Sequence, residues 1–360
     1  MKAAVCYEFG QPLVIEDIEI DHPRGREVKV RLAATAICFS DIHFLREDMP
    51  GKKLPVVAGH ESAGFIEEIG EEVTQVKPGD PVVVSLISSC GSCLYCDSGL
   101  PHLCETPLPK GNHLHNRRGE SLDNFVKVGS FAEYAIVDQS QTVKIPAGMG
   151  MDKAALLGCG VITGFGAVVN RAQVKPLSSV VVIGTGGVGL NSIQGGAFAG
   201  AYPLIAVDVL ENKLQAARAF GATHTVNASQ GDPVEAVRQL TGGRGAEYVF
   251  VTVGSVPAIR QGFAMSARRG MTVIVGIPSR KESLALNPME FIGMERVLTG
   301  CNMGSTNLRQ HIPKLVTLYQ EGKLKLDELI TRRYPLEEIN QAIISVEKGE
   351  ALRNVIVFNP

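Results

Sequence analysis

The alternation of apolar strands and helical stretches after Ser178 constrains the fold more than any other feature of the chain. The apolar runs VVVIG, LIAVDV, YVFVTVG and TVIVGI are separated by stretches of helical composition such as ENKLQAARAFGA. Strands that are apolar along their whole length are buried on both faces, and the helices between them cover the sheet. The pattern predicts a doubly wound parallel sheet in this part of the chain.

The residues before this region have a different texture. Short β-type runs such as EVKVRLAATAI, AGFIEEIG and PVVVSLI alternate with turn sequences in the first 150 residues. This is typical of an antiparallel, Greek-key-like β domain. After Cys301 the chain offers two helices and a last strand, RNVIVF, which we expect to return to that first domain. A length of 360 residues also suggests about two domains.

Composition excludes several classes of protein. Hydrophobic content of 45% and charged content of 20% describe an ordinary globular chain rather than a disordered one. A net charge of -2 gives no electrostatic reason to expect a nucleic acid or an anionic membrane as partner. The start of the chain does not look like a signal peptide, and no run approaches the roughly 18 apolar residues of a membrane helix. We therefore expect a cytoplasmic protein.

A glycine-rich turn follows the first apolar strand and opens a helix. Gly184 permits a tight turn, Gly186 lets a pyrophosphate approach the backbone, and Gly189 allows close packing of helix on strand. Asp208 ends the next strand, where its carboxylate would accept hydrogen bonds from the ribose of NAD and repel the 2′-phosphate of NADP. A glycine-rich turn in a nucleotide-free domain is the alternative. The predicted cofactor contacts in the turn are Gly184, Gly186, Gly187, Val188 and Gly189.

The stretch CGSCLYCDSGLPHLC holds Cys90, Cys93, Cys96 and Cys104, half of the eight cysteines of the chain. In a reducing cytoplasm, clustered cysteines are more often metal ligands or catalytic groups than disulfides. Four thiolates can surround one zinc at about 2.3 Å and leave no position for a substrate, so the metal would be structural. An iron–sulfur run is the competing interpretation, but such a run closes with Cys-Pro after a shorter gap.

A second set of ligand types is dispersed along the chain. Cys38 lies in CFSDIH, His60 in GHE and Cys159 in GCG. Each cysteine taken singly is more often a small buried hydrophobic residue. Taken together, two cysteines, one histidine and an open position meet the requirement of a catalytic zinc, and Asp41 is a natural carboxylate to orient the imidazole.

These residues resemble the zinc-containing medium-chain alcohol dehydrogenase family over essentially the whole chain. The motifs GHESAG, GSFAEYA, LLGCGVITGFGAVVN, GTGGVG and LRNVIVF, with the four-cysteine lobe, occur in that family's order and spacing. LLGCG is closest in character to the thiol-dependent formaldehyde and benzyl alcohol dehydrogenases. The resemblance implies an α/β plus β fold: a GroES-like catalytic domain (1–160, with a structural zinc lobe at 88–106), a Rossmann domain (161–302) and a C-terminal return (303–360).

The resemblance also implies a role for each site residue. Cys38, His60 and Cys159 would hold the catalytic zinc, with Glu61 able to approach it, and the four-cysteine array would hold a second, structural zinc. Zinc would lower the pKa of a bound alcohol, whose hydride passes to the nicotinamide of NAD. Ser40 would accept the proton, and the nicotinamide ribose and His43 would carry it outward. The alternative for His43 is a surface histidine.

Further cofactor contacts are implied in the same way. Thr163 would lie near the nicotinamide, Lys213 near the adenosine ribose and Arg353 near the pyrophosphate. Arg353 has an alternative as a surface cation beside the final strand. Residues 105–129 read as one long polar loop, either a solvated insertion or a segment with a role in substrate access. The loop is similar to that of dimeric family members, so we expect a homodimer.

Departures from the family pattern bear on affinity and specificity. Phe39 stands where many members have a basic residue that holds the pyrophosphate, which predicts weaker cofactor binding. Leu86 stands where a pocket residue is often aromatic, which predicts room for a bulkier alcohol. The segment after Cys104 offers only Lys110 where relatives that bind a glutathione adduct have an arginine. Arg117 and Arg118 read as solvated loop charges, with contact to an anionic substrate as the alternative.

The leading prediction is an NAD-dependent zinc oxidoreductase acting on a primary or secondary alcohol, or on an aldehyde or ketone in reverse. One alternative is an S-hydroxymethyl thiol formaldehyde dehydrogenase, which would use formaldehyde only with an added thiol. Another is a catalytically silent zinc-and-nucleotide binding protein, against which the intact ligand set and Ser40 argue. The predicted partners are a small alcohol or aldehyde, and neither a nucleic acid nor a membrane.

Overall fold

The computed structural model describes the chain except for residues 47–52, 107, 109–110, 112 and 359–360. The chain divides into two compact units, the first made of Met1–Cys159 with Asn307–Pro360 and the second of Gly160–Thr306. The boundaries expected from the sequence lie after residues 160 and 302, close to these. Each unit is described by itself.

The second unit is built on a six-stranded sheet in which every pairing is parallel. Val180, Val181 and Val182 of its first strand are fully buried, as expected for a strand covered on both faces. The predicted doubly wound parallel sheet is confirmed. In spatial order the strands are β13 (His224–Asn227), β12 (Leu204–Asp208), β11 (Val180–Ile183), β14 (Ala246–Val251), β15 (Ser266–Ile274) and β16 (Val297–Gly300).

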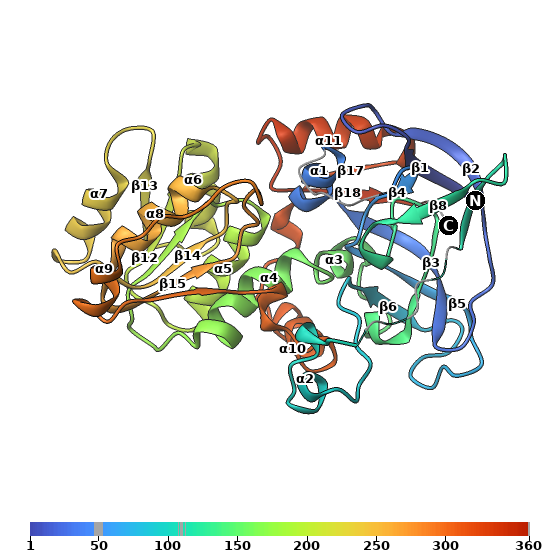
Figure 1. Cartoon of the computed structure of the whole chain (residues 1–360), viewed down its shortest axis with the longest axis horizontal. Helices are drawn as coiled ribbons and strands as arrows, with labels where there is room; N and C mark the ends of the chain where they lie inside the picture. Colours follow the sequence, from blue (N-terminus) through green and yellow to red (C-terminus); the bar gives the residue numbers. More distant parts are fainter. Residues whose placement is uncertain (47–52, 107, 109–110, 112, 359–360) are drawn as a thin grey trace. The chain divides into compact units, whose positions relative to one another are not determined.

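Helices connect these strands and lie along the sheet (Figure 1). The chain leaves β11 and β14 in opposite directions across the sheet, so the switch point of the strand order falls between these two strands, where sheets of this kind bind ligands. The helical elements of the unit are α4 (Gly160–Gly166), the π-helical turn η4 (Ala167–Ala172), α5 (Gly187–Phe198), α6 (Glu211–Ala219), α7 (Pro233–Leu240), α8 (Val256–Met265), α9 (Pro288–Ile292) and η5 (Met303–Ser305).

The first unit is a β structure made of a closed barrel and a second, larger sheet. The barrel contains β1 (Lys2–Cys6), β2 (Val14–Ile20), β7 (Leu114–Asn116), β8 (Ser121–Asn124) and β4 (Val56–Val57). The larger sheet contains β10 (Thr142–Lys144), β6 (Pro81–Val84), β5 (Ser62–Ile69), β3 (Glu27–Ala36), β18 (Arg353–Val357) and β17 (Ile330–Tyr334), with β9 (Tyr134–Asp138) paired to β3.

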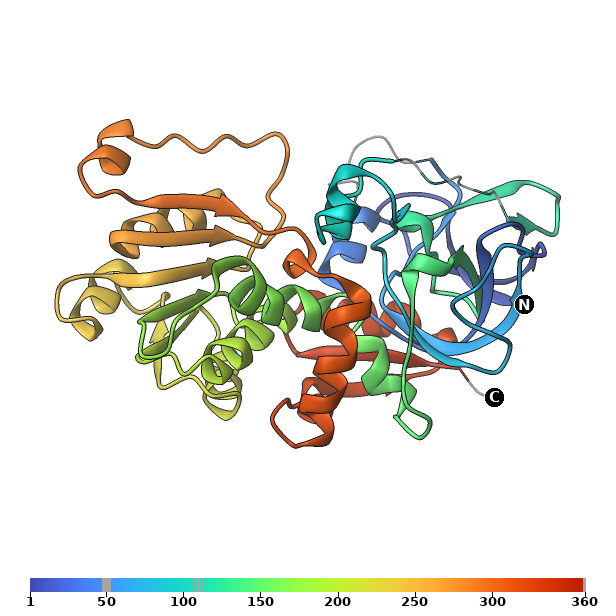
Figure 2. The same ribbon diagram turned by 90° about the horizontal axis from the view of Figure 1, so that it is seen from below.

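The central strand β3 shows why this sheet forms. Its side chains alternate between buried and partly exposed positions along most of its length, which is the period of a strand with one face on the core. The last strand, β18, pairs with it antiparallel, so the C-terminal segment completes this unit. In Figure 2 the red C-terminal strands lie beside the blue N-terminal ones.

The interpretation of residues 105–129 as a single polar loop was wrong. The segment contains β7 and β8, which pair with each other and close the barrel through β2 and β4. Leu114 and Leu122 are buried in the core, and these two isolated apolar side chains among polar neighbours were too few to signal strands. Arg117 forms an ion pair with Asp17, while Lys110 lies outside the described residues.

Short helices join the strands of the first unit. Among the described residues of the whole chain, no helix is long and apolar enough to span a membrane. The helical elements of the unit are α1 (Phe39–Leu45), α2 (Leu94–Asp97), η1 (Pro101–Leu103), η2 (Phe125–Lys127), η3 (Gln139–Gln141), α3 (Met151–Leu156), α10 (Leu308–Gln320), η6 (Asp327–Leu329), η7 (Leu336–Glu338) and α11 (Ile339–Glu347).

Candidate active site and metal centres

Four buried side chains of the first unit form one cluster of possible metal ligands: Cys38, His60, Glu61 and Cys159. Their ligand atoms all lie within 4.8 Å of one another. The sheet brings the first three together, because β3 and β5 are antiparallel neighbours and the amide of Ala36 donates to the carbonyl of Glu61 at 2.7 Å. Two sulfurs and one imidazole nitrogen are a donor set that suits zinc, and the Glu61 carboxylate adds a fourth possible donor.

Asp41 organises this cluster from the start of α1. Its fully buried carboxylate accepts hydrogen bonds from the backbone amides of Cys38 at 2.9 Å and Gly59 at 3.2 Å. It also lies 2.8 Å from Nδ1 of His60. With Nδ1 donating to Asp41, the other ring nitrogen, Nε2, keeps its lone pair for a metal. The predicted orienting carboxylate therefore also caps the helix that carries the first cysteine.

Ser40 and His43 lie on the same short helix. The hydroxyl oxygen of Ser40 is 3.3 Å from Nε2 of His60, so it lies beside the ligand set, and Ser40 is half-buried. The half-buried ring of His43 meets the exposed ring of Phe39 edge to face, with centroids 5.0 Å apart. The structure thus places the predicted relay residues one turn apart.

Glu61, a member of the cluster, forms a buried ion pair with Arg353. The alternative of Arg353 as a surface cation is wrong, because only 5% of the residue is exposed. Burial lowers the pKa of the guanidinium, but the charges of Glu61 and the two cysteines outweigh it and raise that pKa. Nε of Arg353 is buried and has no hydrogen-bond partner among the described residues.

The two thiols of the cluster have opposite pKa shifts. A hydrogen bond with Cys159, helped by His60, holds the pKa of Cys38 well below its usual value, and the same bond with burial raises the pKa of Cys159 well above it. Burial lowers the pKa of His60, but the charge and hydrogen bond of Asp41 outweigh it and raise that pKa. Because Cys159 holds its proton beside the Cys38 thiolate, a second thiolate forms only with a cation nearby. A divalent metal would supply that charge and displace the proton as it binds.

The second cluster contains the four cysteines of the 90–104 lobe, whose sulfurs also lie within 4.8 Å of one another. The Cys90 and Cys96 sulfurs are 4.0 Å apart, and those of Cys93 and Cys104 are 3.8 Å apart. A tetrahedron with zinc–sulfur bonds of about 2.3 Å has edges of about 3.8 Å. Hydrogen bonds from Thr106 and the Ser92 amide lower the pKa of Cys90 to about 5, whereas burial raises the pKa of Cys96 to about 12. Cys90 is therefore a ready thiolate ligand, and Cys96 would give up its proton to a bound metal. The lobe therefore fits a closed four-sulfur zinc site.

In the second unit, the glycine-rich turn connects β11 to α5. Gly184 has a φ of +86°, which favours glycine, and a side chain at Gly189 would begin 1.8 Å from the carbonyl oxygen of Gly184. At Gly186, the N-cap of α5, an added Cβ would meet nothing within 4 Å, so the backbone there is open. Gly187 and Val188 form the first turn of α5, whose free amides suit a phosphate.

The carboxylate of Asp208 already accepts hydrogen bonds in this structure. The backbone amide and hydroxyl of Thr185 donate to Oδ2 at 2.7 and 2.9 Å, and the amides of Val209 and Leu210 donate to Oδ1. These bonds fix the carboxylate beside the glycine-rich turn. Lys213 is buried nearby in α6, and burial lowers its pKa against the opposing charge of Asp208.

Two further predicted residues have neighbours within their own units. The hydroxyl of buried Thr163 donates to the sulfur of Met303 at 3.7 Å. Leu86 packs, partly buried, against the hydrophobic core of the first unit.

The pairing of Glu61 with Arg353 and the bonds from Thr185 to Asp208 were not predicted from the sequence, since neither has a signal in local sequence spacing.

The comparisons with known proteins agree with this geometry. Residues 24–147 match the family described as alcohol dehydrogenase GroES-like domain, and residues 187–321 match zinc-binding dehydrogenase. The chain is 37% identical over 368 residues to an NDMA-dependent alcohol dehydrogenase of Amycolatopsis methanolica, covering 99% of each chain.

Solved structures give the same result. A benzyl alcohol dehydrogenase of Acinetobacter calcoaceticus superposes with a TM-score of 0.93 at 34% identity, covering 99% of each chain. A putative zinc-binding dehydrogenase of Sinorhizobium meliloti, bound to NADP, superposes with a TM-score of 0.84 at 26% identity, again over 99% of each chain. These relatives favour neither the thiol-adduct alternative nor the catalytically silent one. The chain therefore belongs to the zinc-containing medium-chain alcohol dehydrogenase family and is a zinc-dependent alcohol oxidoreductase that uses a nicotinamide cofactor.

Proposed function

We propose that the enzyme oxidises primary or secondary alcohols with NAD, and reduces the corresponding aldehydes or ketones in reverse. Cys38, His60 and Cys159 would hold the catalytic zinc, and the four cysteines of the lobe would hold a structural zinc. The observation that carries this proposal is the buried cluster of four ligand atoms within 4.8 Å of one another, separate from the four-sulfur cluster.

The protein's own residues have distinct roles in this reaction. A bound zinc would supply Lewis acidity toward the oxygen of the alcohol. The Ser40 hydroxyl, 3.3 Å from the His60 ring nitrogen, is within reach of a group at the ligand set and would take up the proton of the alcohol. His43, one turn further along α1, would pass that proton toward water. Asp41 would hold the imidazole in the ligating orientation.

The preference for NAD over NADP rests on Asp208. The four donors around its carboxylate fix it at the end of β12, where its negative charge would repel a 2′-phosphate. The ribose hydroxyls of NAD would have to share the Asp208 carboxylate with Thr185, or replace one of its four present donors. The contacts of Thr163, Lys213 and Arg353 with the cofactor remain predictions, and the unpartnered Nε of Arg353 supports an anionic ligand there.

The substrate class is best tested with a panel of alcohols. Benzyl alcohol comes first, because one relative is named for it. We expect NADH to form with primary or aromatic alcohols in the absence of any thiol. Parallel sets contain NADP in place of NAD, formaldehyde with glutathione, and NDMA, on which another relative depends by its name. Turnover of formaldehyde with glutathione and of no simple alcohol would contradict the proposal.

We also propose a cytoplasmic homodimer. The dimer rests on the resemblance of the segment after Cys104 to that of dimeric family members, although this segment holds β7 and β8 and is not a single loop. The eight free cysteines, half of them clustered at a proposed zinc site, support a reducing compartment. Size-exclusion chromatography with light scattering tests the dimer, and a mass of one or four chains would contradict it.

A further inference from the structure

A buried turn in the first unit lies against the start of the four-cysteine lobe. Residues 138–142, here called the 138–142 turn, connect β9 to β10 through η3. The Asp138 carboxylate accepts from the Ser140 amide at 2.8 Å, and the Gln141 side chain accepts from the Asp138 amide at 3.2 Å. The Thr142 hydroxyl donates to the Gln139 carbonyl at 2.9 Å. The turn is therefore held rigid by its own side chains.

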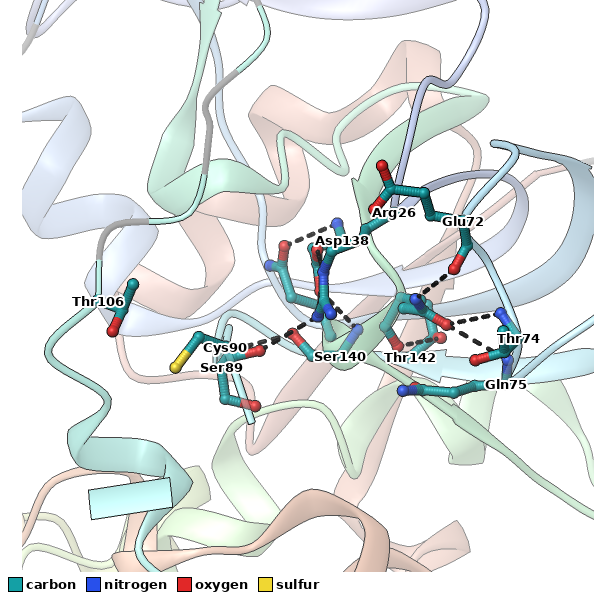
Figure 3. A network of polar contacts seen from close by, with 12 residues as sticks. Arg26, Glu72, Thr74, Gln75, Ser89, Cys90, Thr106, Asp138, Ser140 and Thr142 are labelled. Carbon is teal, nitrogen blue, oxygen red and sulfur yellow. Dashed lines mark hydrogen bonds and ion pairs between the residues drawn. The ribbon is translucent and has the colours of Figure 1, made fainter. Parts of the chain in front are cut away.

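This turn and Arg26 together bind both backbone polar groups of Ser89, the residue before the first lobe cysteine (Figure 3). The Ser89 amide donates to the hydroxyl oxygen of Ser140 at 2.9 Å. The Ser89 carbonyl accepts from Nη2 of Arg26 at 3.4 Å. Arg26 is itself fixed by two hydrogen bonds to Asp138, at 3.0 and 3.1 Å. The position of Cys90 is thus set from outside the lobe.

The charges beside the lobe also suit a metal centre at the four cysteines. A divalent ion with four thiolates carries a net charge of about -2. Arg26, Arg309, Cys90 and Cys96 line one cavity of about 250 Å³, and the two arginines are the only cations among its described lining residues. Arg309 reaches the side chain of Gln75, a neutral amide, so its charge has no carboxylate partner in that contact. Arg26 is already paired with Asp138, so Arg309 is the cation of this cavity that is placed to offset the charge of the metal centre.

We propose that Arg26 and Ser140 are positioning residues for the metal of the four-cysteine centre. They fix the backbone of Ser89, hold the Cys90 sulfur at one corner of the tetrahedron and slow the loss of the metal. A ligand that is held in place before binding loses less entropy on coordination, and residues outside the ligand shell often change metal affinity about 10–100-fold. This inference rests on the proposed zinc in the lobe.

The same turn supplies a matched control. Gln139 is as buried as Ser140, and its side chain accepts from the amides of Thr74 and Gln75 at 3.1 and 3.3 Å and donates to the Glu72 carbonyl at 3.2 Å. None of these bonds involves Ser89. Replacing Gln139 therefore removes buried hydrogen bonds from the 138–142 turn without releasing the lobe.

The experiment uses the full-length enzyme with cobalt(II) in place of zinc. Cobalt bound by four sulfurs and by two sulfurs with nitrogen gives different sulfur-to-cobalt absorption, so the loss of metal to excess EDTA is followed at each centre separately. The wild type is compared with R26M, S140A and Q139A at a temperature at which circular dichroism shows each variant folded. We expect R26M and S140A to lose the four-sulfur signal at least about tenfold faster than wild type. We expect Q139A to lose it within about twofold of the wild-type rate.

Loss at the wild-type rate in either R26M or S140A would overturn the inference, and so would equal acceleration in Q139A. Zinc analysis of the wild type separates this result from a failure of the proposed function. A wild type without lobe zinc contradicts the proposed function, whereas a normal zinc content with unchanged release contradicts only the positioning role.

Discussion

Replacing Asp41 by asparagine tests the link between the helix cap and the metal site. Of the carboxylate oxygens, Oδ2 accepts from the Cys38 amide, while Oδ1 accepts from Gly59 and faces His60. Asparagine has one acceptor and one NH2 group in their place. Whichever way the amide turns, at least one buried donor faces another donor, and the charge that favours a ligating Nε2 is lost.

The size of the effect follows from these contacts. A hydrogen bond to a charged group contributes about 1.5–3 kcal/mol, so D41N should lower the free energy of unfolding by about that amount. The affinity for the catalytic zinc should fall about 10–100-fold, as expected for a carboxylate that orients a ligating histidine. We expect the fold and the four-cysteine zinc to be retained.

The assay is a competition between the enzyme and a chelator of known zinc affinity, with urea unfolding measured in parallel. Asp80 offers a matched control, because it is a buried carboxylate bonded to the Lys77 amide and to Lys144, away from the cluster. D80N should lose stability and keep its zinc affinity. Wild-type affinity in D41N, or an equal loss in D80N, would refute the reasoning.

Five further variants test other residues of the two units. C93S should lose the lobe zinc and thermal stability, whereas C159S should remain folded and bind NADH with little turnover. Zinc analysis and melting curves distinguish the two variants, and full turnover by C159S would contradict the role of Cys159 as a ligand of the catalytic zinc. D208S should lower the ratio of kcat/KM with NAD to that with NADP at least about tenfold, and an unchanged ratio would remove Asp208 as the discriminating residue. F39R should tighten NADH binding about tenfold, or about 1.4 kcal/mol, because a cation at this exposed position would form a charge-assisted hydrogen bond to the pyrophosphate. Equal or weaker binding in a fluorescence titration with NADH would refute this. E61Q should lower the free energy of unfolding by about 3–5 kcal/mol, because it leaves the buried guanidinium of Arg353 without its carboxylate partner. Urea unfolding measures the loss, and a change below about 1 kcal/mol would contradict the prediction.

Local patterns in the sequence were sufficient for the second unit and for the lobe. Continuous apolar strands, the glycine-rich turn and a carboxylate at the end of the next strand are all read within short windows, and the parallel sheet follows from them. The four cysteines are likewise close in sequence, so their convergence needs only short turns. The β-hairpin of β7 and β8 was missed because the two strands are short and mostly polar.

The dispersed cluster could not be derived from spacing. Cys38, His60 and Cys159 meet only because β3 and β5 pair and α3 returns to them, so their grouping came from the resemblance to the family. The partner of Glu61 lies 292 residues further along the chain, and only the pairing of β18 with β3 brings it there. Long-range pairing of strands leaves no periodic signal at the residues that it joins.

Elemental analysis of the freshly purified wild-type enzyme tests the central claim most directly. The two ligand clusters are complete, share no residue and have donor sets that suit zinc. We therefore expect two zinc ions per chain. One zinc per chain, or iron accompanied by acid-labile sulfide, would contradict it.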